Sequence, residues 1–182
     1  GNVFGKLAHD NTWGSASHNT SYRCWIVNQS SVTMPPTTAR WGADIQEHSY
    51  TNNVVGCVIG KSGDTGVQYA VDGQSVSTGA SYRLGFLTPG GSTITDTSVA
   101  TTSYLHGNYD NISSTTIWDA GNADHTLPSS LYYATQPSWW GTTRWPPIGS
   151  DLSPMTSDLP AKHLLGRSLS THRPNVRKRG GI

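Results

Sequence analysis

Residues 41–48 contain side chains that could perform acid–base chemistry on a sugar. Asp44, Glu47 and His48 are titratable, and Trp41 could stack on a sugar ring beside them. Cleavage of a glycosidic bond uses two carboxyl groups on either side of that bond. In an extended strand, Asp44 and Glu47 would point to opposite faces, so they meet only where the chain turns. We take Asp44, Glu47 and His48 as candidate catalytic residues; the alternative, which we favour, is a solvated corner.

Tryptophans are candidates for binding sugar rings, because the apolar face of a pyranose packs against an indole. Three of them follow one another closely near the end of the chain, namely Trp139, Trp140 and Trp145, and Trp41 is a fourth candidate. The alternative for the first three is that they cover the core, since prolines flank them.

Two arginines are candidates for reading acidic sugars. Ser21-Tyr22-Arg23 recurs as Ser81-Tyr82-Arg83. If the two phrases occupy equivalent positions of a repeating fold, Arg23 and Arg83 would form one row that binds uronate carboxylates. The alternative, which we favour, is that each arginine pairs with a nearby aspartate.

A group of histidines and aspartates could suggest a metal site. Its members are His106, Asp110, Asp119, Asp124 and His125. Their spacing fits no known set of ligands, and aspartates commonly bond to their own backbone in turns. We therefore predict turn roles for the aspartates and no metal or other cofactor; Ca²⁺ is conceivable but no motif supports it.

The chain has two cysteines, Cys24 and Cys57, without the spacing of a metal site. They could form one disulfide or remain two small buried apolar residues, and the second interpretation is slightly favoured. Both alternatives stay open at this point.

Composition limits the fold class. The 182 residues include 20 Gly, seven Trp and eight Tyr, and 13% are charged. Helix formers such as Glu and Lys are scarce, which argues against a helical bundle, and no apolar run is long enough to span a membrane. The aromatic residues supply area for a core, which argues against disorder. The sequence predicts an all-β, turn-rich protein.

Short apolar or β-branched runs between polar turns predict the strands. The predicted ranges are 2–6, 22–28, 54–59, 66–71, 82–87 and 115–118. Asn2-Val3-Phe4-Gly5 resembles Asn53-Val54-Val55-Gly56, as expected if coils repeat. Asn52–Gly60 reads as a polar corner, an apolar strand and a glycine at the next corner. Residues 118–161 are rich in Trp and Pro, which predicts an extended segment covering the body, with a helical turn near Pro128–Tyr132.

Residues 48–60, 106–110, 117–133 and 136–149 resemble the C-terminal part of secreted right-handed parallel β-helix proteins of the pectin-lyase-like superfamily. The resemblance covers roughly residues 1–161. It implies β-helix coils over residues 1–117, the last coils of such a protein, and a Trp/Pro-rich capping segment over 118–161. The basic residues 162–182 match nothing in these proteins, and we expect a disordered tail there.

The resemblance implies a secreted or cell-surface protein associated with polysaccharide binding or degradation. We expect this portion to be non-catalytic; an enzyme of this kind would be a polysaccharide lyase or a glycoside hydrolase. The alternative is a structural or adhesive β-helix, such as part of a viral tailspike, without enzymatic activity. A glycan is the expected partner, whereas the basic tail lacks the interleaved aromatics that would favour nucleic acid.

Overall fold

The protein is built from short strands. The computed structural model describes residues 2–28, 40–75, 77–88 and 90–157. Its strands are β1 (Val3–Phe4), β2 (Leu7–His9), β3 (Thr20–Tyr22), β4 (Trp25–Ile26), β5 (Trp41–Ile45), β6 (Asn53–Val55), β7 (Val58–Ile59), β8 (Val67–Tyr69), β9 (Ala80–Leu84), β10 (Tyr104–His106), β11 (Asn108–Asp110) and β12 (Thr115–Ile117). The helices described are α1 (Ser98–Thr102) and the 3₁₀ turn η1 (Ser138–Trp140). The prediction of an all-β protein is confirmed.

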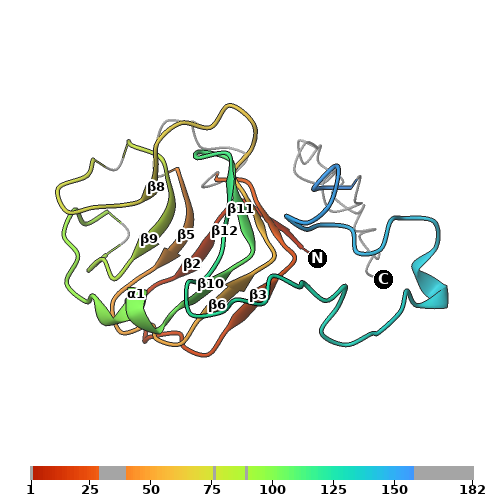
Figure 1. Ribbon diagram of the computed structural model, residues 1–182. Helices are drawn as coiled ribbons and strands as arrows, with labels where there is room; N and C mark the ends of the chain where they lie inside the picture. Colours follow the sequence, from red (N-terminus) through yellow and green to blue (C-terminus); the bar gives the residue numbers. More distant parts are fainter. Residues whose placement is uncertain (1, 29–39, 76, 89, 158–182) are drawn as a thin grey trace, which may run out of the picture.

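The strands form three sheets (Figure 1). Sheet A has the order β1-β4-β7-β11-β12, sheet B the order β2-β5-β9-β8, and sheet C the order β10-β6-β3. The paired strands are parallel except β11 and β12. From β1 to β11 the chain passes through A, B and C in that order three times and then returns to A, with β8 and β9 both in sheet B. Equivalent strands therefore lie side by side on successive passes.

The corner between sheets C and A is a tight bend that repeats on each pass. Its bend residue has a left-handed backbone each time: Arg23 at φ 49°, Gly56 at φ 63° and Gly107 at φ 64°. A Cβ on Gly107 would lie 2.7 Å from the Trp118 ring, so only glycine fits beneath that side chain. The predicted glycine corner at Gly60 is confirmed, since Gly60 has a positive φ of 78°, whereas the bend at Gly56 was not predicted.

An asparagine forms the corner between sheets B and C. The Asn52 side chain is fully buried, and its Oδ1 accepts a hydrogen bond from the backbone N–H of Asn19 at 3.1 Å on the preceding pass. Its Nδ2 donates to the carbonyls of Ala16 and Ser49. These bonds satisfy backbone groups that the bend leaves without strand partners. The predicted polar corner before the apolar strand is thus confirmed.

The core lies inside the three sheets. Its buried apolar members are Cys24, Ile26, Ala43, Ile45, Val54, Cys57, Ile59, Tyr82, Leu84, Val99 and Leu105. Several stack in register across neighbouring strands, such as Ile26 on Ile59 and Ile45 on Leu84. This stacking removes each side chain from water, which is the main favourable contribution to folding.

Some sequence expectations were wrong in detail. The predicted strand 54–59 is two strands, β6 and β7, in different sheets, because the bend at Gly56 divides it. The resembling phrases at Asn2 and Asn53 lie on β1 in sheet A and β6 in sheet C, so they are not equivalent positions. The expected helical turn at Pro128–Tyr132 is absent from the described structure there, and the helical turn lies at η1 instead.

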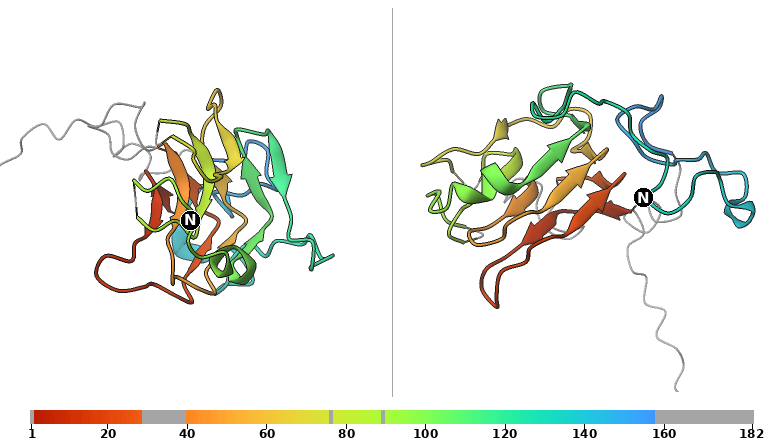
Figure 2. Two further views of the ribbon diagram at one scale, coloured as in Figure 1. Left: turned by 90° about the vertical axis from the view of Figure 1, so that its left-hand side faces the viewer. Right: turned by 60° about the horizontal axis from the view of Figure 1, so that its bottom comes forward.

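The chain after β12 runs along the outside of the body, on the opposite side of the molecule from α1 (Figures 1 and 2). We call residues 118–157 the closing segment. Its contacts with sheets A and C are given below. The predicted tail 162–182 lies outside the described residues.

Candidate functional site

A groove lies over the outer face of sheet C. Two rows of side chains cross its three strands in register. One row is Thr20, Asn53 and Tyr104, and the other is Tyr22, Val55 and His106. All six line a cavity of about 290 Å³. Because neighbouring strands lie about 4.8 Å apart, each row offers evenly spaced polar and aromatic groups.

The closing segment forms the wall of this groove. It contributes Asn122, Asp124, Thr126, Leu127, Pro128 and Leu131 to the lining. Asn122 Nδ2 donates to the Tyr104 hydroxyl at 2.6 Å, and the Tyr22 hydroxyl donates to the carbonyl of Pro128. The wall is therefore fastened to the two outer strands of sheet C, β10 and β3, which it crosses in Figure 1.

His106 fixes the position of the wall with both ring nitrogens. Its Nδ1 accepts from the backbone N–H of Asp119 at 3.3 Å, so Nε2 carries the proton and lies 3.0 Å from the carbonyl of Asp124. The ring stacks on Tyr104, with centroids 5.2 Å apart, and meets Trp118 edge-on. With both nitrogens engaged, His106 holds the groove together and is poorly placed to remove a proton from a ligand.

A second cavity continues the groove beyond β3. Its volume is about 300 Å³, and it shares Thr20, Tyr22 and Leu131 with the first. Tyr132 and Trp145 of the closing segment also line it. The Nε1 atom of Trp145 is buried and has no hydrogen-bond partner among the described residues. The two cavities together make an extended concave surface with aromatic side chains along it.

Arg23 joins the corner after β3 to the closing segment. Its guanidinium donates to Asp151 at 2.8 and 2.9 Å, and its other N–H groups donate to the carbonyls of Leu127, Pro128 and Ile148. Burial tends to raise the pKa of the Asp151 carboxyl, but the hydrogen bonds and charge of Arg23 outweigh it and lower that pKa. The Nε, Nη1 and Nη2 groups of the guanidinium are therefore all hydrogen-bonded within the protein.

Arg83 lies elsewhere, so the hypothesis of a row formed by Arg23 and Arg83 is wrong. It is on β9 in sheet B, whereas Arg23 follows β3 in sheet C. Arg83 Nη1 donates to Asp44 Oδ1 at 2.8 Å, and the guanidinium lies over the rings of Trp41 and Phe86. Repetition of a three-residue phrase did not indicate an equivalent position, because one phrase runs off the end of β3 and the other lies within β9. The alternative, pairing of each arginine with an aspartate, agrees with both ion pairs.

Asp44 and Trp41 are buried with Arg83 and form part of the structure of sheet B. The Asp44 and Arg83 side chains are each 2% exposed. Burial raises the pKa of Asp44, although the charge of Arg83 opposes this. Trp41 is also covered by the ammonium group of Lys6. A buried carboxylate already bound to a buried guanidinium cannot reach a glycosidic bond in this arrangement.

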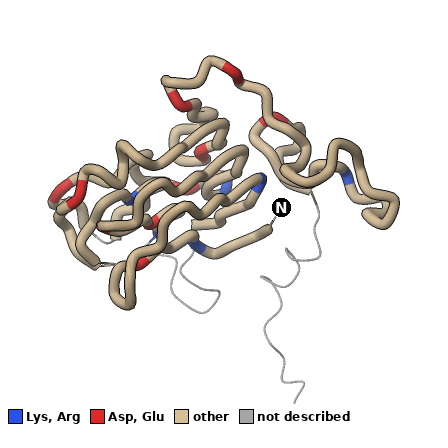
Figure 3. The backbone as a smooth tube through the Cα atoms, turned by 90° about the horizontal axis from the view of Figure 1, so that it is seen from below, with Lys and Arg blue, Asp and Glu red and all other residues tan. Residues whose placement is uncertain are grey.

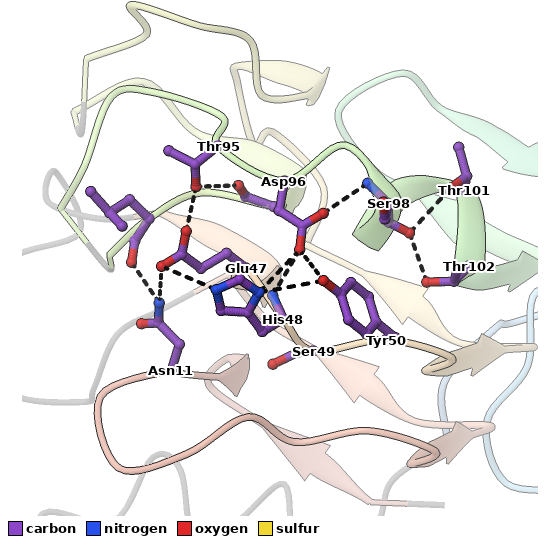
Figure 4. A network of polar contacts seen from close by, with 12 residues as sticks. Asn11, Glu47, His48, Ser49, Tyr50, Thr95, Asp96, Ser98, Thr101 and Thr102 are labelled. Carbon is purple, nitrogen blue, oxygen red and sulfur yellow. Dashed lines mark hydrogen bonds and ion pairs between the residues drawn. The ribbon is translucent and has the colours of Figure 1, made fainter.

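Glu47 and His48 lie in a separate polar network at the corner after β5 (Figure 4). Glu47 accepts hydrogen bonds from Asn11 Nδ2 at 2.7 Å and from Thr95 Oγ1 at 2.6 Å. The His48 ring is 65% exposed, with Nε2 4.0 Å from Glu47 Oε1 and Nδ1 3.6 Å from Asp96 Oδ2. The three catalytic candidates are thus divided: Asp44 is in one cluster, and Glu47 with His48 is in another.

Asp96 completes this network and was not predicted from the sequence. It accepts hydrogen bonds from the Tyr50 hydroxyl at 2.7 Å and from the backbone N–H of His48 at 3.0 Å. These bonds lower the pKa of Asp96. They also hold the left-handed backbone of His48, at φ 64°. The network fixes a corner, as the favoured alternative has it for Glu47 and His48, but that alternative is wrong for Asp44 and Trp41, which are buried within β5.

The tryptophans of the closing segment differ in exposure. Trp139 is 68% exposed, whereas Trp140 and Trp145 are partly buried and meet edge-on with ring centroids 4.7 Å apart. Of these three tryptophans, only Trp145 lines the second cavity. The cluster therefore covers the body at Trp140 and Trp145 and presents an indole to solvent at Trp139.

Of the histidine–aspartate group, His106 lies against the backbone of Asp119 and Asp124 and near the ring of His125. Asp110, Asp119 and Asp124 each accept a hydrogen bond from the backbone N–H two residues further on, as expected of turn residues. His106 and His125 have ring centroids 6.1 Å apart, but among the described residues no three titratable ligands gather to hold a metal ion. No helix in the described part of the chain is long and apolar enough to cross a membrane.

Charged groups are scattered over the described body and form no continuous stripe (Figure 3). The two arginines considered above are neutralised by Asp151 and Asp44. Among the described residues that line the groove over sheet C, Asp124 is the single carboxylate. The groove therefore offers hydroxyl, amide and aromatic groups with little charge.

In comparisons with known proteins, no family model, no curated protein and no solved structure matches the chain.

Proposed function

We propose that the protein is part of an extracellular right-handed parallel β-helix protein of the pectin-lyase-like kind, secreted or displayed at the cell surface, and that it binds a polysaccharide without cleaving it. The recurring A, B, C order of parallel strands supports the fold, and the sequence resemblance supports the family. The single observation that carries the binding proposal is the groove over sheet C, where two rows of side chains repeat from strand to strand.

The repeat of the groove matches the repeat of a glycan. Strands about 4.8 Å apart present one polar or aromatic group per strand, a spacing close to the length of one pyranose residue in a chain. Aromatic rings, here Tyr22 and Tyr104, supply faces for the apolar side of a sugar. Asn53 and Thr20 supply amide and hydroxyl groups for its hydroxyls.

The absence of a second carboxylate supports a non-catalytic role. Glycoside hydrolysis requires two carboxyl groups flanking the bond, and the described lining of this groove contains Asp124 alone. The side chain of Thr126 and then its backbone N–H, which donates to Asp124 Oδ1, lower the pKa of the Asp124 carboxyl and keep it ionised. An ionised carboxylate without a cationic partner in the groove favours neutral glycans over polyuronates.

Titration calorimetry with neutral and uronate oligosaccharides tests this function. We expect binding of a neutral oligosaccharide that Asn53→Ala weakens about fivefold, since one lost hydrogen bond costs about 1 kcal/mol. Gln68→Ala is the matched control, because each amide donates to one hydroxyl, that of Thr20 for Asn53 and that of Ser113 for Gln68 on β8. Binding to no glycan, together with a trimer in light scattering, would favour the structural or adhesive alternative.

A further inference from the structure

Cys24 and Cys57 lie directly beside each other on successive passes of the chain. Each comes one residue before a sheet A strand, and those strands pair in register, with Trp25 opposite Val58. The backbone N–H of Cys24 donates to Cys57 Sγ at 3.4 Å, and both thiols are free and buried. Neighbouring strands lie about 4.8 Å apart, which falls within the Cα separations of about 4.4–6.8 Å that a disulfide spans.

The two thiols differ in environment. Cys24 lines the second cavity, of about 300 Å³, so a small reagent can reach it from the surface. A hydrogen bond with the Cys57 thiol lowers the pKa of Cys24 to about 7, whereas burial raises the pKa of Cys57. A thiolate is the nucleophile in thiol–disulfide exchange, so Cys24 is suited to react first and Cys57 second.

Asn108, on the third pass of the chain, holds the backbone of Cys57 in place. Its backbone N–H donates to Asn108 Oδ1 at 2.9 Å, and Asn108 Nδ2 donates to the carbonyl of Val54 at 2.7 Å. These bonds tie the corner of the third pass to the corner of the second. The backbone of Cys57 is therefore held in place beside Cys24.

We propose that Cys24 and Cys57 form a disulfide that cross-links successive corners between sheets C and A, with a low-molecular-weight disulfide such as glutathione disulfide as the oxidant. The Cys24 thiolate attacks one sulfur of the oxidant, forming a mixed disulfide and releasing one glutathione thiolate. The Cys57 sulfur, giving up its proton, attacks Cys24 Sγ and displaces the second glutathione. Two thiols are oxidised and one glutathione disulfide is reduced to two glutathione molecules.

The bond would stabilise the stack of passes. It closes a loop between positions 33 residues apart in sequence. Closing a loop of this size lowers the conformational entropy of the unfolded chain. Because this favours the folded state, we expect oxidation to raise Tm by on the order of 10 °C. Because the bond joins inward-facing groups of the core, the sheets themselves need not rearrange.

Incubation of the folded protein with glutathione disulfide, followed by alkylation in denaturant and mass spectrometry, tests the proposal. The expected result is a protein with no alkylatable thiol and a peptide joining Cys24 to Cys57, with Tm raised and the circular dichroism spectrum retained. Two alkylatable thiols after incubation would overturn the proposal, as would disulfide-linked dimers.

Single variants test the order of attack on the same protein. Cys57→Ser should accumulate a stable mixed disulfide between Cys24 and glutathione, whereas Cys24→Ser should react at least tenfold more slowly at Cys57. Equal rates in the two variants would contradict the assignment of Cys24 as the attacking thiol. If either variant fails to fold, the time course of the wild-type mixed disulfide at Cys24, by peptide mapping, gives the same answer.

Discussion

Arg23 and Asp151, distant in sequence, are joined by two hydrogen bonds of 2.8 and 2.9 Å. The Arg23 side chain is 3% exposed and the Asp151 side chain 36% exposed. This pair fastens the closing segment to the corner after β3, next to the two cavities that share Tyr22. This ion pair is therefore one of the contacts that hold the groove wall, beside those made by Tyr22, Tyr104 and His106.

Removal of Asp151 should loosen the wall. Asp151→Ala leaves a buried guanidinium with fewer partners, and we expect a loss of about 2 kcal/mol in the free energy of unfolding, less than for a fully buried pair because Asp151 is partly exposed. Asp10→Ala is the control, since Asp10 is exposed and bonds only locally, to Thr12. Urea unfolding measures both; equal losses would contradict the role of the pair.

Acid should weaken the same attachment. Arg23 lowers the pKa of Asp151 below its ordinary value of 3.8. A carboxyl whose pKa is lower in the folded state stabilises the fold above its unfolded pKa, and this contribution is lost as the pH falls through the folded value. Tm should therefore fall more steeply below pH 4 in the wild type than in Asp151→Asn. Parallel profiles of the two proteins would show that Asp151 does not contribute.

The buried pair on sheet B should matter for stability and not for glycan binding. Arg83→Leu strands Asp44 without its partner, which we expect to cost about 3–5 kcal/mol. Replacing both residues, as Asp44→Leu with Arg83→Met, should recover most of that loss, because no uncompensated charge remains. Thermal unfolding tests this; a double variant no more stable than Arg83→Leu would be evidence against it.

The bend at Gly107 should tolerate no side chain. Gly107→Ala would place a methyl group 2.7 Å from Trp118 and 3.0 Å from Leu127, in addition to the strain of a left-handed backbone. Gly73→Ala is matched, since Gly73 also has a positive φ but no atom within 4 Å of the added group. We expect the free energy of unfolding to fall by about 1 kcal/mol for Gly73→Ala and by at least twice that for Gly107→Ala. If denaturant titrations gave similar losses of unfolding free energy for both variants, the closing segment at Trp118 and Leu127 would have to move aside freely.

Local residue chemistry predicted the corners and part of the strands. Asn52 and Gly60 were recognised because bends need polar side chains and left-handed glycines, whereas Gly56 was taken for part of a strand. The strand β5 was missed because Gly42 and Asp44 interrupt its apolar residues. Asp44 is accommodated there only through Arg83 on the neighbouring strand, a pairing that the local sequence does not contain.

The groove could not be predicted, because it depends on register. Thr20, Asn53 and Tyr104 form one row although the two intervals between them differ, the longer one including β8, β9 and α1. No fixed period connects these residues. Tyr22 ends a short strand and Tyr104 begins one, and each has a polar neighbour in sequence, which is a usable local signal. The pairing of the strands, however, decides which side chains meet.

The most direct test of the central claim is nuclear magnetic resonance titration of the labelled protein with the neutral oligosaccharide that binds best. We predict shifts concentrated at the backbone amides of β3, β6, β10 and residues 122–131, with those of β8 unchanged. Shifts centred on the Glu47–His48–Asp96 network, or spread evenly over the protein, would contradict a binding groove over sheet C.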